Sequence, residues 1–204
     1  MPQPDLTPTW QRTWSDLGAT PPATLLPQLL AAYAEPQRHY HSVQHLSECM
    51  AHLGPALHLA QRPGEVAIAL WFHDAVYQLR SGDNEAQSAA WAQRELMAAG
   101  VGADACARVE ALIMATRHDA QPTEPDARLL VDVDLAILGA PPQRFAEYEA
   151  QVQLEYAWVP KWLFKRKRRA VLRGFLDRSP IYSTDHFRTL LEAQARVNLA
   201  ASMA

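Results

Sequence analysis

The chain is poor in cysteine: only Cys49 and Cys106 occur among its 204 residues, and they lie far apart. A structural zinc site or a redox motif built on cysteine normally uses a CxxC pair, and the sequence has none. Each cysteine lies in an apolar stretch with helical spacing. We therefore expect two buried free thiols in a protein of a reducing compartment.

Long hydrophobic runs are missing as well. No apolar segment approaches the roughly 20 residues that a membrane-spanning helix needs. The first residues, Met1 to Pro8, contain neither the basic segment nor the apolar segment of a signal peptide. These features predict a cytoplasmic protein without a membrane partner.

Strand patterns are absent too, whereas helical periodicity covers most of the chain. Apolar residues recur at intervals of three and four, and prolines and glycines fall mostly between the periodic segments. We expect an all-α fold, a single-domain helical bundle of about eight to ten helices over residues 1–204. Helices are expected at 43–57, 66–72, 86–99, 104–116, 126–138, 142–156, 161–177 and 185–201, and helix starts at Thr7-Pro8 and Thr20-Pro21.

Charge is distributed unevenly. The formal net charge is −3, yet eight lysines and arginines fall between Lys161 and Arg178. A local cationic patch on an acidic protein favours a small anionic ligand over a long nucleic acid. Lys165 and Arg168 are candidates for binding a phosphate group, and a merely solvated helix face is the alternative.

Histidine is concentrated in one segment, His39-Tyr-His41-Ser-Val-Gln-His45. On a helix, His41 and His45 would be four residues apart and would share a face. Imidazoles on one face can supply a metal ligand and a proton donor side by side. A solvated polar helix face is the alternative.

Two further elements place carboxylates in apolar surroundings. His73 and Asp74 are adjacent within a segment that reads Ala-Leu-Trp-Phe-His-Asp-Ala-Val, and Asp132 and Asp134 lie in Val-Asp-Val-Asp-Leu. Burial of a carboxylate is costly unless it is paired or bound to a cation. Two imidazoles with two carboxylates suit one divalent ion, namely Mn²⁺, Fe²⁺, Zn²⁺, Co²⁺ or Mg²⁺, with positions left for water and a phosphoryl oxygen.

The order His45, His73-Asp74, Asp134 resembles the HD superfamily of metal-dependent phosphohydrolases over about residues 38 to 139. The segment from Arg38 to Leu46 is also similar to the YHNxxH segment of cyclic-nucleotide phosphodiesterases, with Ser42 in place of Asn. This resemblance implies that His41 is the general acid. It implies that His45, His73, Asp74 and Asp134 bind the metal. Asp134 is preferred to Asp132 because Leu135 follows it.

Three other residues are candidates, and each has an alternative interpretation. Glu85 orients the water in one interpretation and stabilises the start of its helix in the other. Arg38 is either a phosphate ligand or an exposed residue before a helix. His118 is a substrate contact, a second-metal ligand or an exposed loop residue.

The resemblance implies a hydrolase that cleaves a phosphate ester or pyrophosphate bond in a nucleotide-like small molecule with a metal-activated water. Two alternatives stay open: a non-catalytic metal- or nucleotide-binding sensor, and a di-iron oxygenase of the same fold. The oxygenases use about two histidines between the His-Asp pair and the last Asp, and here only His118 lies there. The C-terminal helices are amphipathic enough to form a homodimer interface or to cover the core.

Overall fold

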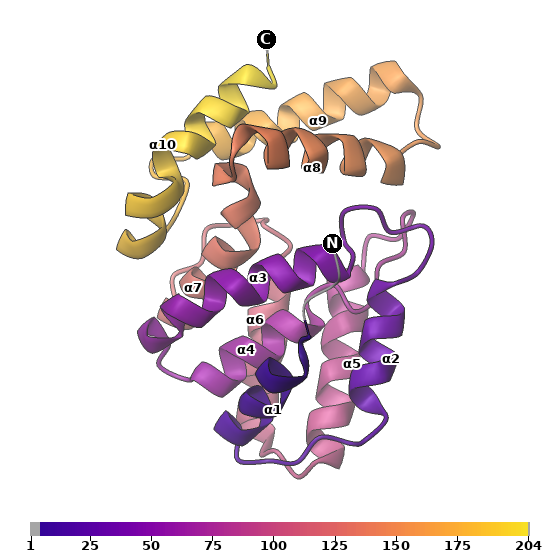
Figure 1. Ribbon diagram of the computed structural model, residues 1–204, viewed down its shortest axis with the longest axis vertical. Helices are drawn as coiled ribbons and strands as arrows, with labels where there is room; N and C mark the ends of the chain where they lie inside the picture. The colour runs from indigo at the N-terminus through magenta and orange to yellow at the C-terminus, as the bar shows by residue number, and fades with distance from the viewer. Residues whose placement is uncertain (1–4, 204) are drawn as a thin grey trace. The chain divides into compact units, whose positions relative to one another are not determined.

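The structure is a computed structural model that describes residues 5–203 (Figure 1). The described residues form ten α-helices and two short 3-10 helices, and no strand occurs among them, which confirms the predicted all-α fold. The elements are α1 (Thr7–Asp16), α2 (Leu25–Tyr33), α3 (Val43–Ala56), η1 (Leu57–Leu59), α4 (Pro63–Phe72), α5 (Asn84–Ala98), α6 (Ala103–Ala115), α7 (Pro125–Asp134), η2 (Leu135–Gly139), α8 (Pro142–Glu155), α9 (Lys161–Leu176) and α10 (Asp185–Ala201).

The chain divides into two compact units, one ending at Val131 and the other beginning at Asp132. The boundary falls within α7, the last helix of the first unit. The expectation of a single domain over residues 1–204 stays a prediction. Between residues 5 and 203, no helix is both long enough and apolar enough to span a membrane.

Helix α4 forms the centre of the first unit. It packs against α1, α3, α5 and α6, and nine of its ten residues, Gly64 to Phe72, are buried. A helix that is apolar on every side is stable only when other helices surround it. The uninterrupted run Val66-Ala-Ile-Ala-Leu-Trp-Phe therefore accounts for its central place.

The start of α4 is held by residues from other parts of the first unit. At its start, the carboxylate of Asp126 accepts hydrogen bonds from the backbone N–H groups of Gln61 and Arg62. Gly64 lies so close to the end of α1 that a Cβ there would be 2.8 Å from the backbone of Asp16. These contacts fix the position of the first turn of α4 and hence the direction of the helix axis.

The second unit is built around η2, α8, α9 and α10. Asn198 of α10 donates hydrogen bonds from its amide to the carbonyl oxygens of Leu138 and Ala140, and Tyr182 donates to that of Leu135. Gly139 allows this close approach, because a Cβ on it would lie 2.6 Å from Cβ of Leu191. The predicted helix 126–138 is thus α-helical only to Asp134 and continues as a 3-10 turn.

Candidate metal centre

His45 and His73 face each other inside the first unit. His45 lies in the first turn of α3, and His73 is the residue at which α4 ends. Their Nε2 atoms are 3.1 Å apart, and both side chains are almost fully buried. Two ligands about 2.1 Å from one ion, at angles between octahedral and tetrahedral, lie about 3.0–3.4 Å apart. The distance between the two imidazoles therefore suits a shared ion.

The tautomer of His73 is set by the backbone. Its Nδ1 lies 2.7 Å from the carbonyl oxygen of Leu70, one turn earlier in α4. A carbonyl only accepts hydrogen bonds, so Nδ1 carries the proton and donates it. Nε2 is therefore the ring nitrogen left to bind an ion beside His45, and a backbone partner of this kind is typical of metal-ligating histidines.

Asp74 adds a carboxylate to the two imidazoles. Its Oδ2 lies 3.1 Å from Nε2 of His73 and 3.6 Å from Nε2 of His45. Burial alone would raise the pKa of the Asp74 carboxyl, but the neighbouring charges of His73, His41 and His45 and a hydrogen bond with His73 lower it well below its usual range. An anionic oxygen and two imidazole nitrogens thus converge on one point, which fits a divalent cation.

Cys49 also lies beside these donors, although the sequence predicted only a buried free thiol at this position. It follows His45 by one turn of α3, and its Sγ is 3.6 Å from Nδ1 and 3.7 Å from Nε2 of that residue. The candidate ligand atoms of Cys49, His45 and His73 all lie within 4.8 Å of one another. The expected burial of Cys49 is confirmed. The signal for its place was available in the spacing, because residues four apart share a helix face.

The backbone that carries Asp74 is held by Arg38 and Tyr33. The Arg38 guanidinium is buried and donates to the carbonyl oxygens of Asp74, Ala75 and His41 and to the carboxylate of Glu35. The Tyr33 hydroxyl donates to the carbonyl of Trp71 and accepts from the N–H of Asp74. Arg38 is therefore not the exposed residue of the alternative interpretation, and its contact with a substrate phosphate stays a prediction.

His41 is near the site but not on α3. The helix begins at Val43 with Ser42 as N-cap, so the prediction that His41 and His45 share one helix face is wrong. The turn nevertheless keeps the two ring centroids 6.0 Å apart, and the His41 ring stacks on Tyr77 at 4.0 Å. Because His41 precedes the helix, the orientation of its ring is set by stacking on Tyr77 and not by helical periodicity.

The second unit distinguishes Asp132 from Asp134. The Asp132 carboxylate is fully buried and accepts hydrogen bonds from the N–H groups of Ser183 and Thr184 and from the Thr184 hydroxyl. These bonds anchor the start of α10, so both oxygens have a structural partner. Asp134, the last residue of α7, belongs to the same unit. The choice of Asp134 over Asp132 as the fourth ligand stays a prediction.

The remaining predicted residues lie on other elements. Glu85 is in the first turn of α5, and His118 is a half-buried residue after α6 with a positive φ of 58°. In the second unit, Lys165 is exposed on α9, whereas the Arg168 guanidinium pairs with the carboxylate of Glu149 and lies 4.8 Å from the Tyr148 ring centroid. The proposed parts of these four residues in water orientation and substrate binding stay predictions.

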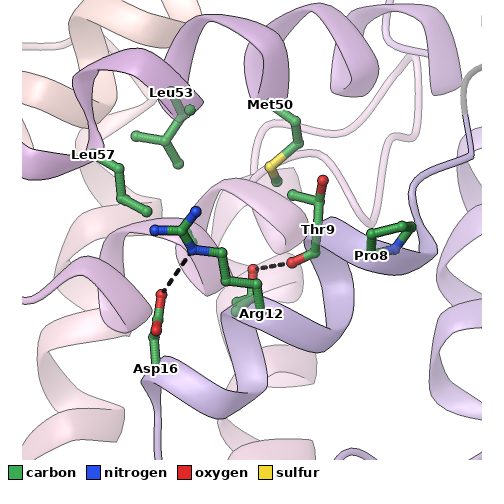
Figure 2. Close-up of a pocket in the computed structure, with 10 residues that line it drawn as sticks. Pro8, Thr9, Arg12, Asp16, Met50, Leu53 and Leu57 are labelled. Carbon is green, nitrogen blue, oxygen red and sulfur yellow. Dashed lines mark hydrogen bonds and ion pairs between the residues drawn. The ribbon is translucent and has the colours of Figure 1, made fainter.

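A hollow of about 280 Å³ lies elsewhere in the first unit, between α1 and α3 (Figure 2). Its wall combines the apolar Met50, Leu53 and Leu57 with Arg12 and Asp16, whose side chains approach to 3.8 Å. None of the predicted site residues lines it. The candidate centre is therefore defined by the converging side chains and not by this hollow.

In comparisons with known proteins, no family model, no curated protein and no solved structure matches this chain.

Proposed function

We propose that this protein is a metal-dependent hydrolase of a phosphate ester or pyrophosphate bond in a nucleotide-like small molecule. One observation carries the proposal: two buried Nε2 atoms lie 3.1 Å apart, and a carboxylate oxygen of Asp74, whose side chain is 13 % exposed, lies within 3.6 Å of both. His45, His73 and Asp74 would hold the ion, and Asp134 would complete the set. The bound ion supplies Lewis acidity and lowers the pKa of a water molecule to near neutrality.

We assign the transfer of a proton to His41. Its ring stacks on Tyr77, and its centroid lies 6.0 Å from that of the His45 ring. Imidazole is the side chain whose proton is exchanged most readily near pH 7. His41 would protonate the leaving oxygen of the substrate, and Glu85 would orient the attacking water.

The anionic substrate would be matched by cations of the chain. Lys165 is solvent-exposed and available for a phosphate, and Arg38 and Arg168 would act through their guanidinium groups. Most of the hydrogen-bonding groups of Arg38 and Arg168 already have internal partners.

The first test is the metal content of the protein purified without chelator, measured by elemental mass spectrometry. We expect about one transition-metal ion per chain, and its loss in Asp74→Ala. Asp126→Asn is the matched control, because Asp126 is also a buried carboxylate of the first unit but binds backbone N–H groups. Retention of the metal in Asp74→Ala would refute the assigned site.

The second test is phosphate release from nucleoside mono-, di- and triphosphates and from pyrophosphate, with the ion found in the first test. Release that is lost in Asp74→Ala and kept in Asp126→Asn would support hydrolysis. A metal-loaded protein that binds these compounds but releases phosphate from none of them would overturn the enzymatic proposal and favour a sensor.

A further inference from the structure

We propose that Cys49 supplies a thiolate to the metal centre, so that the resident ion is Zn²⁺, Co²⁺ or Fe²⁺ and not Mg²⁺ or Mn²⁺. The inference rests on the metal centre of the proposed function and narrows its cofactor. It does not require that the substrate carries a phosphate. It therefore stands or falls separately from the hydrolytic activity.

The position of the sulfur agrees with a ligand position. For an ion about 2.3 Å from a thiolate and about 2.1 Å from an imidazole in tetrahedral geometry, sulfur and nitrogen lie about 3.6 Å apart. Sγ of Cys49 is 3.7 Å from Nε2 of His45. The sulfur and the two imidazoles lie within 4.8 Å of one another. The three ligand atoms are therefore close enough for one ion to contact them all.

Cys106 shows what a buried thiol of this protein looks like without such surroundings. Its Sγ faces the carbonyl oxygen of Val101, and burial raises the pKa of its thiol. Cys49 is equally buried, at 2 % exposure, but it faces two nitrogen atoms of His45. The two cysteines differ in their neighbours and not in burial, which makes Cys106 a matched control.

The donor set determines the class of ion. A thiolate beside two imidazoles, added to the carboxylates of the proposed function, makes the site borderline-soft. Thiolates select Zn²⁺ and iron over the hard ions Mg²⁺ and Mn²⁺, which prefer oxygen ligands. On binding, the S–H bond of Cys49 breaks, the sulfur pair forms the bond to the ion, and the proton passes to solvent.

The test uses Co²⁺ as a spectroscopic probe of the full-length protein, because a cobalt–thiolate bond produces a charge-transfer absorption in the near ultraviolet. We expect this band in the wild type and in Cys106→Ser, and its absence in Cys49→Ser. Zn²⁺ in equimolar amount should abolish the band, whereas excess Mg²⁺ should not. Affinity for Zn²⁺ should fall at least about tenfold in Cys49→Ser.

Two outcomes would overturn the inference: a band that persists in Cys49→Ser, or visible cobalt absorption in the wild type without a near-ultraviolet band. If Cys49→Ser does not fold, X-ray absorption of the zinc-loaded wild type answers the question without a variant. A sulfur neighbour at about 2.3 Å supports the inference, and only nitrogen and oxygen neighbours refute it. A thiolate signature without phosphate release would refute the proposed hydrolysis alone.

Discussion

Arg38 donates a hydrogen bond from Nη1 to the backbone carbonyl oxygen of Asp74, 36 residues further along the chain. Its Nη2 binds the next carbonyl, that of Ala75, at 2.9 Å. One guanidinium thus binds the carbonyl oxygens of two consecutive residues just after the end of α4. The Asp74 side chain extends from this segment toward His45 and His73. The orientation of Asp74 depends on this buried cation.

Replacement of Arg38 by Lys is therefore expected to weaken metal binding, because an ammonium group cannot reproduce the planar fork that binds two carbonyls. We expect a loss of roughly 10- to 100-fold in metal affinity, the range for residues that orient ligands. Destabilisation of about 2 kcal/mol should accompany it, from unpaired buried carbonyls. Calorimetric metal titration and thermal melting measure the two effects. Arg12→Lys is the control, since the Arg12 side chain is 74 % exposed. Unchanged metal affinity in Arg38→Lys would contradict the positioning role.

His41→Ala should keep the metal and lose turnover. The ring lies in the turn before α3 and stacks on Tyr77, so its removal leaves His45, His73 and Asp74 in place. Loss of a general acid typically reduces the rate about 10²- to 10⁴-fold. Elemental analysis and phosphate release are measured on the same sample. A variant that loses its metal would show that His41 is a ligand and that its assignment as acid is wrong.

The two aspartates at the end of α7 should respond to substitution in opposite ways. Asp132→Ala leaves the N–H groups of Ser183 and Thr184 without their acceptor, at about 1–3 kcal/mol for each unpaired buried group. We expect a lower melting temperature with the metal retained. Asp134→Ala should lose metal and keep the melting temperature of the metal-free wild type. The reverse pattern would identify Asp132 as the ligand.

Gly139→Ala should destabilise the second unit, because the added Cβ would lie 2.6 Å from Cβ of Leu191 and 2.8 Å from its carbonyl oxygen. Overpacking of this kind costs about 1–3 kcal/mol. Gly174→Ala in α9 is the matched control: a Cβ there has no neighbour within 4 Å, and alanine in a helix interior stabilises by about 0.5–1 kcal/mol. Thermal melting of the two variants should move in opposite directions. A shift to higher temperature in Gly139→Ala would show that η2 and α10 are packed less tightly.

Local patterns in the sequence account for most of the secondary structure. The predicted helix 185–201 coincides with α10, and 161–177 differs from α9 by one residue, because apolar spacing and turn residues act over a few positions. The predicted helix 66–72 lies within α4, which begins three residues earlier, at Pro63. The predicted α-helix 126–138 is wrong from Leu135 onward, where the chain forms the 3-10 helix η2. There the carbonyl oxygen of Leu138 accepts a hydrogen bond from Asn198, 60 residues away.

The candidate metal centre was likewise predictable from the sequence only in part. The cost of burying a carboxylate indicated a cation near His73 and Asp74, and the resemblance implied that His45 is their neighbour. Helical spacing places Cys49 beside His45, but only the tertiary structure brought both of them against His73. It also buried Arg38 against the carbonyl of Asp74 and assigned Asp132 to the start of α10. Periodicity states which residues share a face of one helix. Which residue of another element meets that face is decided by packing and by the hydrogen-bond partners that buried polar groups must find.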